Sequence, residues 1–316
     1  MKYVEDFLWK KGMSVEELVD KQGSLGYQAI ELNKASDVII KMKQAGAKIF
    51  FTFTSNMVTS GLRGFFAQLI KLKMADIIVT TSASIEEDII KAMGDKFEIT
   101  SFNADDIYMR ERGENRIGNL LIRNESYMKF EDNFREILKK IYEKQKRIDV
   151  SDLLREIGLL LNDENSILYQ AAKNNVPIFC PGIADSAIGF HLYMFQQKNN
   201  DFVVDTIRDV KNAIFASNHD EKKGLVSLGG SISKHYAVFS GLLNGGFDYA
   251  VYLTTSHESS GSMSGATTKE AMSWGKIKDS AHTATVNGDV TITFPLVMIR
   301  AMEKLNKQGI LKLDNE

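Results

Sequence analysis

The sequence predicts an α/β fold in which helices cover both faces of one parallel sheet. Six short runs of β-branched and aromatic residues recur along the chain, and each is followed by small polar residues. Stretches with helical spacing of apolar residues separate most of these runs. Alternating strand and helix signals are typical of a parallel sheet covered by helices. With 316 residues, 44% of them hydrophobic, the chain is long enough to bury such a core.

The strands are expected where the β-branched and aromatic runs lie. The first of them reads AKIFFTFTSN and ends in hydroxyl and amide side chains. Each run is short and bounded by small polar residues or glycine, as buried strands of parallel sheets are. The six expected strands cover residues 47–56, 75–84, 176–182, 224–230, 248–256 and 285–295.

Helices are indicated between these strands by apolar residues that recur every three to four positions. The clearest cover residues 58–73, 85–94 and 201–217, and Gly94 is a typical stop signal for the second. Residues 125–175 differ, because helical signals follow one another there with no obvious strand. Ser151 is the expected N-cap of one helix in this mainly helical segment. Because no linker or repeat is visible, we expect one domain over residues 1–316.

Composition and charge exclude several classes of function. Lys plus Arg (39) nearly balances Asp plus Glu (41), for a net charge of −2, so a nucleic-acid partner is not expected. The single cysteine, Cys180, cannot form an intramolecular disulfide. No apolar run approaches the roughly 18 residues of a membrane span, and the charged N-terminal segment lacks a signal-peptide core. We therefore expect a cytoplasmic protein with no membrane partner.

Small, hydroxylic or glycine residues follow the expected strands, where ligands of parallel sheets bind. Such residues let backbone N–H groups approach a phosphate or ribose closely. However, no GxGxxG motif follows the first strand, and GGSISK (229–234) is not a GxxxxGK phosphate loop. A nucleotide site is thus indicated by composition and position only. The residues concerned are Thr54 to Asn56, Thr80 to Ser84, Asp185, Gly229, Gly230 and Thr254 to Ser256.

Two residues stand out as candidates for chemistry. Lys276 follows a glycine and comes two residues after Trp274, so an aromatic wall could shield its amine. A lysine is nucleophilic only when neutral, and because free lysine has a pKa of about 10.4, burial must supply the shift. His235 is suited to acid, base or amine-binding work. The alternatives are a solvated surface lysine and a capping or core histidine.

Other common sites find no support in the sequence. The remaining histidines lack the paired spacing of a zinc site, so no metal is expected. Cys180 lies in an apolar run before a proline, which favours a buried, inert thiol. The GxSxG motif of serine hydrolases is absent.

Over nearly its whole length, the chain resembles the deoxyhypusine synthase family. EAMSWGKI is the most specific of the matching stretches, because in that family its lysine carries the covalent intermediate. The resemblance implies a Rossmann-like NAD-binding domain, assembled as a homotetramer with sites at subunit interfaces. The other stretches are FTFTSNMVTSGLR, ADIIVTT followed by EED, NRIGNLLIRNESYMKFED, VPIFCPGIADSAIG, LGGSISKH and NGGFDYAVYLTT.

The resemblance also implies a reaction. Members of the family use NAD to oxidise spermidine, and the resulting imine passes its aminobutyl group to the active-site lysine, releasing 1,3-diaminopropane. The group then moves to a lysine of the translation factor 5A precursor and is reduced, which is the first step of hypusine formation. Such chemistry needs a neutral lysine, partners for a cationic amine and a held NAD.

Residue roles follow from the same resemblance. Lys276 is implied as the covalent nucleophile and His235 as a group for proton transfer and amine positioning, with Glu270 and Trp274 lining the amine site. Glu87 and Asp185 suit ribose hydroxyls, and glycines allow close approach to the pyrophosphate. The implied NAD-binding residues are Ser55, Asn56, Thr81, Ser82, Glu87, Asp185, Gly229, Gly230, Thr255, Gly261, Ser264 and Asp289.

The chain departs from the family at amine-binding positions. Phe190 and Met263 stand where eukaryotic members have acidic residues that hold the ammonium ends of spermidine. Ser260 also replaces an acid, and Phe239 replaces an asparagine. These departures leave the identity of the donor amine undecided, and a smaller amine such as agmatine is one alternative to spermidine. Two further hypotheses remain: a homospermidine-synthase-like transfer to a free diamine, and a catalytically silent NAD-binding oligomer.

Overall fold

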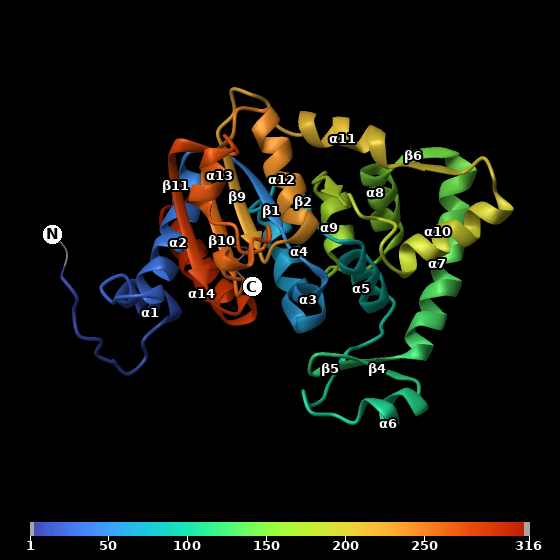
Figure 1. Ribbon diagram of the computed structural model, residues 1–316, viewed down its shortest axis with the longest axis horizontal. Helices are drawn as coiled ribbons and strands as arrows, with labels where there is room; N and C mark the ends of the chain where they lie inside the picture. Colours follow the sequence, from blue (N-terminus) through green and yellow to red (C-terminus); the bar gives the residue numbers. More distant parts are fainter. Residues whose placement is uncertain (1–2, 313–316) are drawn as a thin grey trace. The chain divides into compact units, whose positions relative to one another are not determined.

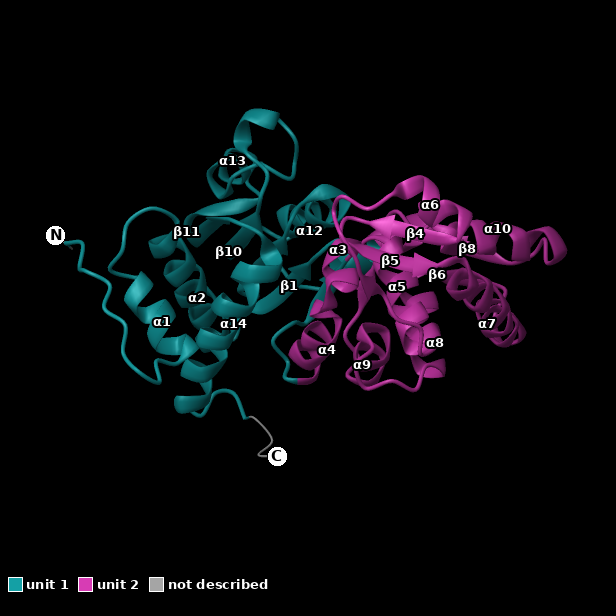
Figure 2. Ribbon diagram, turned by 90° about the horizontal axis from the view of Figure 1, so that it is seen from below, with its two compact units in different colours: residues 1–54, 72–79, 211–316 teal, residues 55–71, 80–210 magenta. Residues whose placement is uncertain are grey.

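The computed structural model describes residues 3–312 of the chain (Figure 1). These residues form two compact units, each built from more than one stretch of the sequence (Figure 2). Unit 1 comprises residues 1–54, 72–79 and 211–316, and unit 2 comprises residues 55–71 and 80–210. The expectation of a single domain stays a prediction.

Unit 1 contains a parallel sheet in the strand order β11-β10-β9-β1-β2. In its register, Phe51 of β1 pairs with Val226 of β9 and Ile78 of β2, and Val251 of β10 pairs with Val226. All six residues of β9 are buried, as expected of a central strand covered on both faces. The strands are β1 (Lys48–Thr52), β2 (Ile77–Val79), β9 (Lys223–Leu228), β10 (Phe247–Thr254) and β11 (Ile277–Asn287).

Helices cover both faces of this sheet, as Figure 2 shows for unit 1. Helices α2 (Gln28–Gln44) and α14 (Val290–Lys307) pack on one face, and α12 (Ser231–Leu243) and α13 (Thr268–Ser273) on the other. The buried guanidinium of Arg300 in α14 bonds the carboxylates of Asp20 and Asp37. These bonds fix α14 against α2 and the short helix α1 (Val15–Gln22).

Unit 2 is mainly helical and has only short strands. β3 (Glu98–Ile99), β5 (Leu120–Arg123) and β4 (Glu114–Ile117) form a small antiparallel sheet in that order, and β6 (Arg147–Asp149) pairs with β8 (Val203–Asp205) in parallel. β7 (Ile178–Phe179) completes its strands among the described residues. Its helices are α3 (Ser55–Met57), the π-helical turn η1 (Val58–Leu62), α4 (Arg63–Lys71), α5 (Ser82–Ala92), α6 (Asp106–Glu111), α7 (Asn124–Lys144), α8 (Val150–Leu160), α9 (Ile167–Lys173) and α10 (Ala187–Lys198).

The predicted fold class is confirmed: the chain is α/β with a central parallel sheet flanked by helices. Five of the six expected strands lie where the β-branched runs occur. The strand expected over 285–295 is confirmed only for residues 285–287 and is wrong for the rest. β11 ends at Asn287, and α14 begins at Val290 because the Asp289 carboxylate caps it by accepting a bond from the Thr291 N–H at 2.8 Å.

Two further expectations need correction in the helical regions. The helix expected over 201–217 is shorter, α11 (Thr206–Phe215), because the residues before it form β8. The segment 125–175 contains β6, which pairs with β8. Ser151 is not an N-cap: α8 begins at Val150 after Asp149, and the Ser151 hydroxyl donates to Asp209 at 2.5 Å. In the described part of the chain, no helix is both long and apolar enough to cross a membrane.

Candidate active site

A cavity of about 230 Å³ lies in unit 1, on the side of the sheet covered by α12 and α13. Its walls come from α12, from β10, from the loop between β10 and α13, and from α13 with the residues that follow it. The structure brings together here the residues expected to carry the chemistry. They are His235, Glu270, Trp274 and Lys276.

Lys276 is held by its backbone at the point where α13 turns into β11. Gly275 takes the left-handed conformation (φ +68°), which glycine adopts without strain. The Lys276 N–H donates to the Ala271 carbonyl at 3.0 Å, and its carbonyl accepts from the Phe247 N–H at 3.0 Å. The side chain is only 8% exposed, and Nζ lies 4.9 Å from the centre of the Trp274 ring. The amine is therefore shielded from water and close to an aromatic face.

His235 and Glu270 line the same cavity from its two helices. His235 is an exposed residue of α12, and Glu270 is an exposed residue in the first turn of α13. The Glu270 N–H donates to the Thr267 hydroxyl at 3.2 Å, which fixes the start of that helix. Of the residues that line this cavity, Glu270 alone carries a carboxylate. Glu270 is therefore the one group with a formal negative charge among the lining residues that could bind a cationic amine.

Lys234 and Tyr252 also line the cavity, and sequence reasoning missed both as site residues. Each is 1% exposed. The Tyr252 hydroxyl is buried without a hydrogen-bond partner among the described residues, and burial raises its pKa. The available signal was position: Lys234 directly precedes His235 in the LGGSISKH motif, and Tyr252 lies in the YAVYLTT strand. An unpartnered buried hydroxyl on a cavity wall suits contact with a ligand.

The loop after β10 packs closely against the start of α12. A Cβ added at Gly230 would lie 2.2 Å from the Ser264 Cα, so only glycine fits there. The Ser231 N–H donates to the Ser264 hydroxyl at 3.2 Å, and the Thr254 hydroxyl donates to the Ser264 carbonyl at 3.2 Å. Gly229 has a positive φ (+75°). Three of the predicted NAD-binding residues, Gly229, Gly230 and Ser264, therefore lie in one cluster at the carboxyl end of β9.

The remaining NAD-binding candidates of unit 1 have different surroundings. Thr255 directly follows β10, and Gly261 (φ +65°) ends the 3-10 turn η2 (Glu258–Ser260). Asp289 uses Oδ1 to accept bonds from the N–H and hydroxyl of Thr291, at 2.8 and 2.5 Å. It therefore has a helix-capping role whether or not it also contacts a ligand.

The other six NAD-binding candidates lie in unit 2. Ser55 and Asn56 form α3, Thr81 is the N-cap of α5, and Ser82 begins that helix. The Ser82 hydroxyl donates to the Ile183 carbonyl at 2.9 Å, which ties α5 to the segment containing Asp185. Asp185 itself is exposed. The sixth residue is Glu87.

Glu87 is a buried carboxyl group with an unusual environment. It is 5% exposed, and its Oε2 has no hydrogen-bond partner among the described residues. Burial, followed by the charge of neighbouring Glu86, raises the pKa of Glu87 to about 9. Glu87 is therefore protonated at neutral pH and can donate as well as accept a hydrogen bond.

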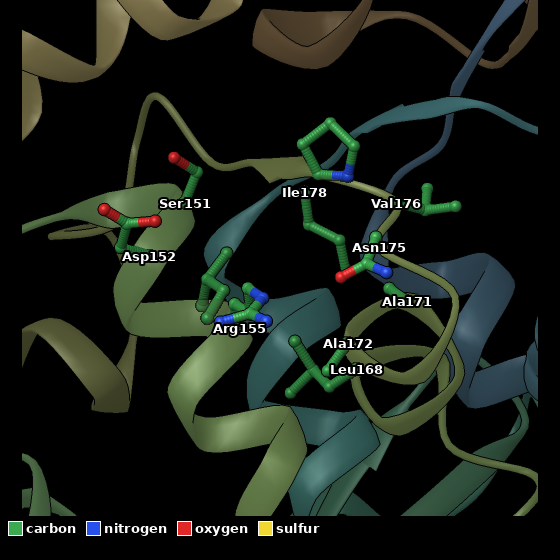
Figure 3. Close-up of a pocket in the computed structure, with 11 residues that line it drawn as sticks. Ser151, Asp152, Arg155, Leu168, Ala171, Ala172, Asn175, Val176 and Ile178 are labelled. Atoms are coloured by element: carbon green, nitrogen blue, oxygen red, sulfur yellow. The ribbon is translucent and has the colours of Figure 1, made fainter.

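Unit 2 also contains a cavity of about 130 Å³ (Figure 3). Asp152 and Arg155 of α8 lie on one side of it, and Ala171 and Ala172 of α9 lie on another. None of the predicted catalytic, amine-binding or NAD-binding residues lines it. The chemistry-bearing residues of unit 1 are gathered in the cavity beside Lys276.

The fold and this cavity define a class of protein: a parallel α/β protein with a shielded lysine beside an aromatic ring and a carboxylate. That set suits covalent chemistry on amines. The family model for deoxyhypusine synthase matches residues 17–301. The chain therefore belongs to the deoxyhypusine synthase family, whose members are aminobutyl transferases.

Individual relatives agree with this assignment. The chain is 36% identical to deoxyhypusine synthase of Arabidopsis thaliana, covering 93% of this chain and 88% of the relative. It is 39% identical to a Thermoplasma volcanium protein assigned as deoxyhypusine synthase, covering 86% and 88%. A solved structure assigned to the same enzyme, from Entamoeba histolytica, has a TM-score of 0.66 at 26% identity and covers 94% and 96% of the two chains.

Proposed function

We propose that this protein catalyses NAD-dependent transfer of an aminobutyl group from spermidine or a related amine, through an imine on Lys276, to a lysine of the translation factor 5A precursor. The observation that carries the proposal is the shielded Lys276 amine, which shares a cavity with Trp274 and Glu270 in a member of this family. The cavity supplies an amine that can form an imine, an aromatic wall and a carboxylate for a cation.

In the proposed reaction, the aminobutyl group is bound covalently to Lys276 between two exchange steps. With spermidine as the donor, the neutral Lys276 amine adds to the carbon of the oxidised donor imine, the bond from that carbon to the donor nitrogen breaks, and 1,3-diaminopropane leaves. The acceptor lysine then displaces Lys276 from the same carbon. NAD, when bound, supplies the acceptor for the hydride taken from the donor and returns the hydride to the final imine.

The neighbouring residues have separate tasks in this proposal. Glu270 binds a positively charged end of the donor, and Trp274 limits the access of water to the imine. His235 transfers protons between the attacking and leaving nitrogens, because imidazole can gain or lose a proton near neutral pH. Tyr252 offers a hydroxyl that has no partner among the described residues.

Two features of the chain fit NAD. In unit 1, Gly229, Gly230 and Ser264 lie together at the carboxyl end of β9, the edge at which parallel sheets bind nucleotides. In unit 2, the unpartnered Oε2 of Glu87 suits a ribose hydroxyl. The other candidate NAD-binding residues stay predictions. By family membership we further propose a homotetramer in the cytoplasm.

The donor amine is proposed from the charges of the cavity. Lys234 brings an ammonium group to its wall, and Glu270 brings its one carboxylate. Met263 lines the same cavity in place of an acid. An amine with fewer charges than spermidine, such as agmatine, therefore fits better. A homospermidine-synthase-like transfer to a free diamine is the second candidate, because the same covalent step serves it.

The test is to trap the intermediate on the full-length protein. Purified protein is incubated with NAD and one candidate amine, reduced with borohydride, and mapped by peptide mass spectrometry. We expect a stable adduct on Lys276 that requires NAD. Products are then analysed with and without the translation factor. A modified factor supports the first reaction, a new free polyamine supports the second, and the lack of any adduct or product would contradict both.

A further inference from the structure

Two lysines line the cavity, and their surroundings differ. The Lys234 ammonium donates to the carbonyls of Met263 at 3.0 Å and Ala266 at 2.8 Å. It also lies 3.9 Å from the centre of the Tyr252 ring. Lys276, in contrast, is placed over the partly exposed ring of Trp274. One amine is thus enclosed by the protein, whereas the other faces the cavity beside a solvent-accessible ring.

The contacts of Lys234 occupy its bonding capacity. An ammonium has three N–H groups and no acceptor. Two carbonyl oxygens and an aromatic face account for its three directions, and the side chain is 1% exposed. An amine that keeps its protons in these bonds has no free electron pair for attack on a substrate. Lys234 is therefore unsuited to covalent chemistry, although it is adjacent to the site.

The same contacts join three walls of the cavity. Lys234 belongs to α12, Tyr252 belongs to β10, and the two carbonyls belong to the loop between β10 and α13. That loop continues directly into α13 and then to Lys276. His235 follows Lys234 on α12. A change at Lys234 would therefore alter the spacing of His235 and Lys276 without touching either.

We propose that Lys234 is a positioning residue, which holds the loop of residues 256–267 against α12 and β10 so that His235 and Glu270 keep their places around Lys276. This inference rests on the proposed function for its kinetic consequence. Burial lowers the pKa of Lys234 to about 8, and the charge of Glu270 opposes that shift. The carbonyls and the ring offset part of this desolvation, since both favour the charged form.

Lys223 provides a matched control within unit 1. It is also fully buried, and its ammonium donates to the carbonyls of Asn218, His219 and Glu221 at 2.8 to 3.1 Å. It does not line the cavity. Its loss should therefore reproduce the general cost of losing a buried, carbonyl-bound ammonium, without the effect on the site.

The experiment compares K234M, K234R and K223M in the full chain. We expect K234M and K223M both to melt at lower temperature, because each leaves buried carbonyls unsatisfied. Only K234M should increase hydrogen exchange in residues 256–267 and lower kcat, on the order of tenfold to a hundredfold for a displaced catalytic group. K234R should recover part of the kcat, because arginine keeps the charge and the donors.

A measurement on the wild-type protein makes the test independent of whether the variants fold. Brief reductive methylation with formaldehyde and cyanoborohydride should modify Lys276 and leave Lys234 unmodified. Labelling of Lys234 at the rate of Lys276, unchanged exchange in K234M, or an equal loss of kcat in K223M would each overturn the proposal. Exchange and labelling need no turnover, so a protein without transfer activity would contradict the proposed function and not this assignment.

Discussion

The cavity of unit 1 and the helix α5 of unit 2 each contain a buried ionisable group whose hydrogen bonds are filled by the protein. In unit 1 that group is Lys234. In unit 2 it is Asp88, which accepts bonds from the Arg63 guanidinium at 2.5 Å and from residues at the start of α9. Lys276 and Glu87 are their counterparts, a shielded amine over a ring and a carboxyl with an unpartnered oxygen.

The difference in bonding separates buried groups that stabilise the fold from buried groups that are available to react. A buried charge whose bonds are all made within the chain stabilises local structure, and removing its partner is costly. A buried ionisable group with an unpartnered polar atom is destabilising unless a ligand or a reaction uses it. The comparison therefore favours a structural role for Lys234 and Asp88, and it supports the proposed functional roles of Lys276 and Glu87.

The largest expected effect is on Lys276. K276R should lower aminobutyl transfer on the order of a thousandfold or more, as loss of a covalent nucleophile does. Arginine stays protonated and cannot form the imine, whereas NAD binding should change little. Transfer assays and calorimetry measure the two properties. The control is K278R, because Lys278 pairs with Asp248 at 2.8 Å and does not line the cavity. Full turnover by K276R would end the covalent assignment.

A loss of stability is expected from Asp88. D88N should lower the free energy of unfolding by about 1.5–3 kcal/mol, since it removes one of the two carboxylates that pair with the buried guanidinium of Arg63, the other being Asp163. Urea denaturation measures this change. D106N is the control, because Asp106 pairs with Arg116 on the surface, where the loss should be much smaller. Equal losses in the two variants would show that burial does not set the strength of these pairs.

Ionisation of Glu87 should make the stability of the protein depend on pH. Its folded pKa, about 9, lies above the ordinary value of 4.5, so its contribution to stability is present below pH 4.5 and is lost as pH rises towards 9. E87Q cannot ionise, and we expect it to gain on the wild type by up to about 1.4 kcal/mol per pH unit in that window. Thermal melts without NAD from pH 5 to 9 test this. The control is E125Q, at an exposed position of α7, whose melting temperature should vary with pH as that of the wild type does. If the melting temperature of E87Q also runs parallel to that of the wild type, the raised pKa of Glu87 is refuted.

The smallest effect concerns the donor amine. M263D adds a second carboxylate to a cavity that has one, and it should lower the KM for spermidine roughly threefold to tenfold, the scale of one partly exposed ion pair. M263N has nearly the same shape without the charge and should leave the KM close to that of the wild type. Steady-state kinetics with spermidine and agmatine make the comparison. A wild-type protein with micromolar KM for spermidine would contradict the view that the cavity lacks negative charge.

Local pattern predicted some elements and misassigned others. Buried strands such as β1 and β9 were predictable because consecutive apolar residues suit a strand covered on both faces. The run after Asn287 is β-branched and indicates a strand, yet the Asp289 cap and the packing of Phe294 on Phe51 at 5.7 Å make it helical. The hairpin of β4 and β5 was not predicted, because its strands are only four residues long and both contain charged residues.

The sequence by itself determined the α/β class, the family motifs and the presence of Lys276, Trp274 and Glu270 in one short segment. These properties depend on residue type and spacing along the chain, which the sequence states directly. Only the tertiary structure decided which buried groups are already bonded. Lys234 and Lys276 are the same residue type, and the carbonyls and rings around them come from segments far apart in the chain. Reactivity depends on those neighbours within a few ångströms, and folding alone brings them together.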